Sequence, residues 1–170
     1  MKRTSFRKWP CSIARTMDLL GDWWTPLVLR ELVYGSERFD DIQAALGVGR
    51  NVLSQRLQRL EKEGLVARRK YQDHPPRHHY LLTEKGRDFF PVLAMIVRWG
   101  DRWLDGGKGP PVLLRHKSCG RAIHGEMVCS HCGKKFTRDD IAVETPAGEP
   151  ITLEDRVSAI ARLNASKSRK

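Results

Sequence analysis

The chain has 170 residues, of which 40% are hydrophobic and 30% charged, and Lys plus Arg outnumber Asp plus Glu by 31 to 20, a net charge of +11. This composition supports a globular core and excludes wholly disordered and collagen-like chains. Its four Cys residues are too few for a secreted disulfide scaffold, and no apolar run reaches the length of a membrane-spanning helix. The positive charge favours a polyanionic partner, either nucleic acid or an anionic membrane surface.

The first ten residues are basic, but no apolar stretch follows them, so we expect no secretory signal peptide. We therefore expect a cytoplasmic, nucleoid-associated protein with no membrane partner.

Apolar periodicity in the first part of the chain predicts four helices, over residues 11–20, 26–32, 39–46 and 50–62. Thr25 is a suitable N-cap for the second helix, because Pro26 follows it at the first helical position. Gly47-Val48-Gly49 predicts a tight turn between the third and fourth helices. The fourth helix places Leu53, Leu57 and Leu60 on one face and ends before Gly64.

After Gly64 the pattern changes to that of a hairpin, with strands over residues 65–71 and 78–82 and a turn at the two prolines between them. Thr83 then begins a long helix that reaches about Leu104, in which Pro91 either kinks the helix or marks its true first turn.

The rest of the chain divides by composition. Residues 105–111 form a Gly- and Pro-rich linker, residues 112–144 contain a Cys/His segment, and residues 145–170 contain a loop, a short helix over residues 153–163 and a basic tail. The body before the linker spans residues 9–104. We expect it to fold as one domain.

Helix, tight turn, helix and hairpin is the order of a winged helix-turn-helix, in which the second helix enters the major groove and the hairpin, or wing, reaches the flanking DNA. The predicted fold class is mainly α, within α+β. It combines this winged helix, a two-stranded wing, a long C-terminal dimerisation helix and a small zinc-ribbon-like appendage.

A helical wheel of residues 50–62 places Asn51, Gln55, Gln58 and Lys62 opposite the leucine stripe, with Ser54 and Arg59 on its flanks. Asn and Gln side chains pair with adenine edges and Arg with guanine, whereas Arg50 and Arg56 lie where they would meet phosphate. The alternative is an ordinary solvated helix face. The predicted DNA-contacting residues are Arg50, Asn51, Ser54, Gln55, Gln58 and Arg59 on the helix and Arg77 on the wing.

The Cys/His segment repeats one pattern, in which two ligand residues separated by two others precede a Gly: His116 with Cys119, then Cys129 with Cys132. Two such knuckles provide a closed tetrahedral set for one structural Zn²⁺. A metal-free hairpin and a redox-active pair of Cys129 and Cys132 are the alternatives. His124 and His131 are alternative fourth ligands.

Residues 9–104 resemble the HxlR-type winged helix-turn-helix regulators through Cys11-Ser-Ile-Ala-Arg15, Leu19-Leu-Gly-Asp-Trp-Trp-Thr25, Leu29-Arg-Glu-Leu32, Arg38-Phe39, Asn51-Val-Leu-Ser-Gln-Arg-Leu57, Leu60-Glu-Lys-Glu-Gly-Leu-Val66 and Tyr80-Leu-Leu-Thr-Glu-Lys-Gly86. The resemblance implies a bacterial homodimeric transcription factor without catalytic activity, whose first helix and post-wing helix build the dimer interface.

The same resemblance implies a role for Cys11, because some members sense oxidants or electrophiles through a Cys at the equivalent place. The alternative is a buried structural Cys. The five Trp residues either line an aromatic effector pocket or pack in the core and the dimer interface.

The leading interpretation is therefore a homodimeric, sequence-specific DNA-binding regulator of a pseudo-palindromic operator, which responds to oxidants, electrophiles or another small-molecule effector. The alternatives are a non-specific nucleic-acid-binding or architectural protein and, further off, a zinc-dependent hydrolase. We expect no enzymatic activity.

Overall fold

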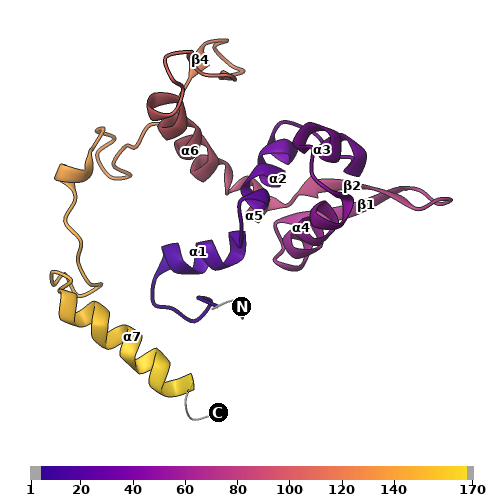
Figure 1. Ribbon diagram of the computed structural model, residues 1–170. Helices are drawn as coiled ribbons and strands as arrows, with labels where there is room; N and C mark the ends of the chain where they lie inside the picture. The colour runs from indigo at the N-terminus through magenta and orange to yellow at the C-terminus, as the bar shows by residue number, and fades with distance from the viewer. Residues whose placement is uncertain (1–4, 168–170) are drawn as a thin grey trace. The chain divides into compact units, whose positions relative to one another are not determined.

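The computed structural model describes residues 5–167, which form two compact units. The larger unit comprises residues 22–126, and the described residues of the smaller one are 5–21 together with 127–167. The elements of the larger unit, drawn in Figure 1, are α2 (Trp24–Val33), α3 (Phe39–Leu46), α4 (Arg50–Lys62), β1 (Val66–Gln72), β2 (Arg77–Leu82), α5 (Glu84–Arg87), α6 (Phe90–Trp103), β3 (Leu114–Arg115) and β4 (Ala122–Ile123). The smaller unit contains α1 (Ser12–Leu20), the 3-10 turn η1 (Arg138–Asp140) and α7 (Leu153–Lys167).

Helices α2, α3 and α4 surround the core of the larger unit. The leucine stripe predicted for α4 is buried, since Leu53, Leu57 and Leu60 are each at most 1% exposed. Leu29 of α2 and Ile42 of α3 are buried to the same degree. Each such side chain contributes roughly 1.5–3 kcal/mol of hydrophobic stabilisation. The predicted helices over residues 39–46 and 50–62 have the observed bounds of α3 and α4, and the winged-helix prediction is confirmed.

The start of α2 differs from the prediction. The helix begins at Trp24, one residue before Thr25, and Thr25 is a fully buried residue inside it. The cap is supplied by Asp22, whose Oδ1 accepts the backbone N–H groups of Trp24 at 2.8 Å and Thr25 at 3.1 Å. Thr25 was the wrong N-cap because the carboxylate of Asp22 reaches the same free amides from three residues upstream.

The wing is an antiparallel pair in which Val66 lies opposite Leu82 and Arg69 opposite His79. A third segment joins it, because Arg38 forms a β-bridge with His79 and the Tyr80 N–H donates to the Glu37 carbonyl at 2.8 Å. These bonds attach the base of the wing to the segment between α2 and α3.

The chain after the wing forms two helices where the sequence predicts one. Thr83 caps α5 by accepting the N–H of Gly86. A Cβ on Gly86 would lie only 2.1 Å from the Leu65 carbonyl oxygen, so this turn needs Gly. Pro91 lies in the first turn of α6, where its missing N–H leaves no hydrogen bond unmade. Of the two roles predicted for Pro91, the structure shows the helix start.

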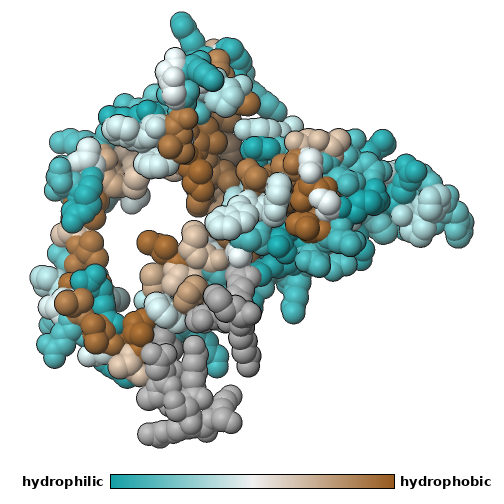
Figure 2. Space-filling model, viewed as in Figure 1, coloured by the Kyte–Doolittle hydropathy of each residue, from teal (hydrophilic) through white to brown (hydrophobic). Residues whose placement is uncertain are grey.

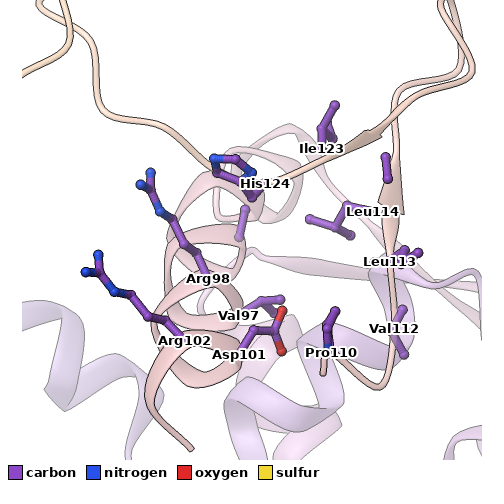
Figure 3. A pocket seen from close by; sticks show the side chains of 12 residues that line it. Val97, Arg98, Asp101, Arg102, Pro110, Val112, Leu113, Leu114, Ile123 and His124 are labelled. Carbon is purple, nitrogen blue, oxygen red and sulfur yellow. The ribbon is translucent and has the colours of Figure 1, made fainter. Parts of the chain in front are cut away.

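Helix α6 exposes much of its apolar surface. Ile96 is 52% exposed, Trp99 59% and Trp103 63%. In Figure 2 the helix accordingly carries a continuous hydrophobic patch. On the other side of α6, this helix and the β3–β4 hairpin line a cavity of about 370 Å³ that is open to solvent, shown in Figure 3.

The smaller unit has little buried surface. In α1, the carboxylate of Asp18 is buried and accepts the backbone N–H of Phe6 at 3.0 Å. Helix α7 extends beyond the predicted residues 153–163 and reaches Lys167. No helix in the described part of the chain is long and apolar enough to cross a membrane.

Candidate nucleic-acid interface

Helix α4 presents a polar face to solvent because its leucine stripe fixes the opposite face in the core. Asn51, Gln55, Gln58 and Lys62 are exposed, as the helical wheel indicates. Ser54 and Arg59 are half-buried on the flanks of this face. The face therefore combines amide groups that pair with base edges and cations that pair with phosphate. Contact between these residues and DNA remains a prediction.

Arg50 opens α4 and is positioned by α3. Its Nη1 lies 3.1 Å from Asp40 Oδ1 and 3.3 Å from Gln43 Oε1, and its guanidinium lies 4.8 Å from the centre of the Phe39 ring. The side chain is nevertheless 68% exposed. Arg50 is thus held at the entrance to the recognition helix and still available to a phosphate.

Arg56 has a different role from the phosphate contact predicted for it. Its Nε lies 2.7 Å from Asp22 Oδ2, and both side chains are less than a quarter exposed. This ion pair joins α4 to the start of α2. Arg56 therefore positions the recognition helix from inside the protein.

The wing carries its basic residues on both faces, because successive strand residues point to opposite sides. One face holds Arg69 and Arg77, both exposed. The other holds Arg68, which pairs with Glu61 at 3.4 Å, and Lys70, which pairs with Asp73. Arg77, next to the tip, remains the predicted wing contact.

The ring of His79 is held at the base of the wing. Its Nδ1 lies 2.9 Å from Glu37 Oε2, and its ring meets Tyr71 edge-on at 4.5 Å. Arg38 lies over the Tyr71 ring at 5.2 Å. This cluster fixes the direction in which the hairpin leaves the body.

Cys11 lies at the N-cap of α1, and its Sγ accepts the N–H of Ala14 at 3.5 Å. The thiol is exposed. This exposure is that of the single chain, so the sensor role and the alternative of a structural Cys both remain predictions.

The four predicted metal ligands are split between the units, His116 and Cys119 in the larger and Cys129 and Cys132 in the smaller. Among the described residues, no group of three or more His, Cys, Asp or Glu side chains forms a metal-binding cluster. Within the second pair, backbone N–H groups of Cys132 and His131 donate to the Cys129 sulfur and lower the pKa of that thiol below its ordinary value.

Sequence reasoning missed two residues that position the interface, Asp22 and Glu37. Asp22 caps α2 and pairs with Arg56, and Glu37 holds His79. Asp22 could have been found from its position, since an Asp whose side chain accepts the backbone N–H groups two and three residues further on is a common helix cap. No local pattern identifies Glu37, because its partner is 42 residues away.

Comparison with known proteins relates most of the chain to transcription factors. The sequence model of the HxlR-like helix-turn-helix family matches residues 19–108. A Mycobacterium tuberculosis protein named as an HTH-type transcriptional regulator is 40% identical over 137 residues, which are 81% of this chain and 87% of that protein. A Bacillus subtilis protein of the same description is 40% identical over 54% of this chain and 85% of its own length.

Solved structures extend the likeness. The crystal structure of PA1607, titled as a putative transcription factor, matches this chain with 28% sequence identity and a TM-score of 0.66, covering 89% of this chain and 96% of PA1607. The redox regulator HypR in its reduced form is 28% identical at a TM-score of 0.52, covering 56% of this chain and 95% of HypR.

Proposed function

The chain belongs to the HxlR-like helix-turn-helix family, and from this premise we propose that it regulates transcription as a homodimer that reads a pseudo-palindromic DNA site. The observation that carries this proposal is the polar outer face of α4, held outward by the buried leucine stripe. Arg50, Asn51, Ser54, Gln55, Gln58 and Arg59 are the proposed contacts from α4, with Arg77 from the wing.

The apolar surface of α6 supports the homodimer. Ile96, Trp99 and Trp103 of α6 are each more than half exposed, and in α1 Ile13 is 73% and Met17 50% exposed. Hydrophobic patches of this kind are normally covered by a partner. A twofold pair of α6 helices would present two α4 helices to successive major grooves, about 34 Å apart.

Selection of bound sequences from a random duplex pool tests specificity. We expect a motif with two inverted half-sites. Gln55→Ala should alter the preferred base at one position in each half-site, because it removes a bidentate amide. Enrichment of no motif would favour the non-specific, architectural alternative.

Arg77→Gln tests the wing. We expect weaker binding to every sequence. The slope of the logarithm of the affinity against the logarithm of the salt concentration should also become shallower by roughly one per wing, because each phosphate contact releases a counterion. Lys108→Gln is the matched control, as it removes an exposed cation of the linker. Equal affinities and slopes in both variants would remove Arg77 from the interface.

Ile96→Asp tests the dimer interface. A charge in the centre of a buried apolar patch should leave a folded monomer with weaker operator binding, measured by light scattering and circular dichroism. Val143→Asp is the control, because Val143 is exposed, and it should leave the dimer intact. A monomeric wild-type chain at micromolar concentration would contradict the proposal.

Regulation by oxidants through Cys11 is a second candidate, supported by the exposure of this thiol and by the likeness to a redox regulator. A peroxide would take two electrons from the Cys11 thiolate and leave a sulfenate and water. We expect hydrogen peroxide to change operator affinity in the wild-type chain and not in Cys11→Ser. The same response in both proteins would show that Cys11 is not the sensor.

The cavity beside α6 is the proposed site for a small-molecule effector. Figure 3 shows Val97, Leu114 and Ile123 among its lining, with Arg98 and His124 at one side. An added ligand that raises the melting temperature of the wild-type chain should have no effect on Val97→Trp, which fills the space.

A further inference from the structure

The cavity beside α6 lies wholly within the larger unit, since every residue that lines it falls between Ala94 and His124. Its volume of about 370 Å³ is in the size range of small-molecule sites. Most of its wall is apolar, with Val97 from α6, Pro110 from the linker and Leu114 from β3. This wall suits the apolar part of a ligand, so the few polar groups decide which head group the ligand can carry.

Contacts to α6 hold the opposite wall of the cavity in place. The β3–β4 hairpin pairs Leu114 with Ile123, and the chain that leaves β4 passes directly against the helix. A Cβ built on Gly125 would lie 2.9 Å from the Met95 sulfur. The guanidinium of Arg98 also donates a hydrogen bond to the Gly125 carbonyl. These contacts attach the hairpin to the helix, so both walls belong to one packed structure.

Four charged or titratable side chains line the cavity, and three of them have contacts to residues outside its lining. Arg98 forms the hydrogen bond just described. The guanidinium of Arg102 lies 4.9 Å from the centre of the Trp103 ring. His124 Nε2 lies 3.3 Å from Glu126 Oε1. In Figure 3 the guanidinium groups of both arginines also point away from the β3 strand, so neither is directed into the apolar space.

Asp101 is the fourth of these side chains, and it is oriented differently. It is half-buried and follows Val97 by one helical turn, and Figure 3 shows both side chains pointing from α6 toward Pro110. Among the described residues, no hydrogen bond or ion pair reaches the Asp101 carboxylate. A carboxylate that is partly removed from water attracts a cation more strongly than one in bulk solvent. The polar group that faces the apolar space is therefore an anion.

We propose that this cavity binds a small organic cation, whose ammonium group pairs with the Asp101 carboxylate and whose aromatic or aliphatic part contacts Val97 and Leu114. The proposal rests on the effector site proposed above and names the chemical class of its ligand. The ammonium and the carboxylate form a charge-assisted hydrogen bond, and burial of the hydrocarbon part adds hydrophobic stabilisation. An anion of the same shape would be repelled by Asp101.

Three compounds that differ only in their head group test the charge of the ligand: phenylbutylamine, phenylbutanol and phenylbutanoate. In titration calorimetry on the full chain, the amine should bind at least about tenfold more tightly than the alcohol, and the carboxylate should bind most weakly. The net charge of +11 favours anions in general, so a preference for the amine identifies a local carboxylate. No binding of the amine up to about 1 mM, or tighter binding of the carboxylate, would overturn the proposal.

Asp101→Asn tests the counterion, because it removes the charge and keeps the size of the side chain. We expect the affinity for the amine to fall at least about tenfold and that for the alcohol to change by less than about twofold. Asp88→Asn is the matched control, since it removes an exposed carboxylate outside the cavity, and it should leave every affinity unchanged. Circular dichroism checks that both variants are folded. An unchanged affinity for the amine in folded Asp101→Asn would overturn the proposal.

Val97→Trp and an operator-binding assay separate this proposal from the effector role. Val97→Trp fills the space and should abolish binding of the amine, and binding that survives would place the amine outside the cavity and overturn the proposal. Binding that requires both Val97 and Asp101 but leaves operator affinity unchanged would support the cation site and contradict only the effector role. Binding that requires Val97 alone, with a change in operator affinity, would overturn the cation site and leave the effector role standing.

Discussion

The region before the linker and the Cys/His segment after it are stabilised in different ways. Residues 22–104 contain a core of side chains that are almost wholly buried, such as Leu57 and Ile42, whereas residues 112–144 contain no buried residue. The first region gains its stability from apolar surface removed from water. The second has backbone turns without such a core, and zinc binding there remains a prediction from the Cys/His spacing. The two regions should therefore respond to different perturbations.

Truncation of a side chain should have very different effects on the free energy of unfolding in the two regions. Leu57→Ala should lower the free energy of unfolding by about 3 kcal/mol, because it leaves a cavity in the core that the neighbouring side chains cannot fill. Val143→Ala, at a side chain 61% exposed, should change it by less than about 0.5 kcal/mol. Urea denaturation followed by circular dichroism measures both. Similar losses in the two variants would contradict the contrast.

Removal of the Asp22 carboxylate should have the next largest effect. Asp22→Ala leaves two helix amides and Arg56 without their partner, and should lower the free energy of unfolding by about 2 kcal/mol. A double-mutant cycle with Arg56→Met isolates the ion pair, for which we expect a coupling of about 1 kcal/mol. A coupling near zero would mean that the cap alone matters.

Chelation should act on the Cys/His segment alone. If the zinc predicted from the Cys/His spacing is present, a chelator under reducing conditions should speed proteolytic cleavage within residues 112–144 at least about tenfold, because the segment has no buried core to hold it without the ion. The urea midpoint of the winged-helix region should not move. Cleavage at the same rate with and without chelator would be evidence against a metal-stabilised segment.

The smallest expected difference in stability is between two helix caps, both supplied by threonines. Thr83 donates to the Gly64 carbonyl at 2.6 Å and accepts the Gly86 N–H at 3.2 Å. Thr137 caps the exposed turn η1 through a capping box with Asp140. Thr83→Ala should cost about 1 kcal/mol of global stability and Thr137→Ala less than about 0.5 kcal/mol. Equal costs in urea denaturation would place η1 in the same cooperative unit as the wing.

Sequence patterns predicted the parts of the fold that depend on local order. The leucine repeat and flanking glycines of α4 predicted its bounds, because burial of one helix face imposes a period on the chain. The same periodicity could not reveal the break between α5 and α6, since Pro91 was compatible with a kink or a helix start. Nor could it assign Arg56, whose place on the wheel suited phosphate until the structure showed Asp22 beside it.

The candidate site was predictable to a similar extent. The exposure of Asn51 and Gln55 follows from the helix period, so their faces were predicted correctly. The bracing of Arg50 by Asp40 and of His79 by Glu37 was not, because each pair joins separate elements. Spacing also showed that the two Cys/His pairs share one sequence pattern, but only the structure shows that both pairs form the same hydrogen-bonded turn.

The bridge between Arg38 and His79 has a consequence for the thermodynamics of DNA binding. Together with the Tyr80–Glu37 hydrogen bond, it orders the base of the wing before any DNA is present. A hairpin already fixed at its base loses less conformational entropy on association than a free one. More of the favourable free energy of each phosphate contact therefore contributes to the affinity for DNA. The exposed tip at residues 73–76 has no such bridge among the described residues, so most of the wing's entropy loss should fall there.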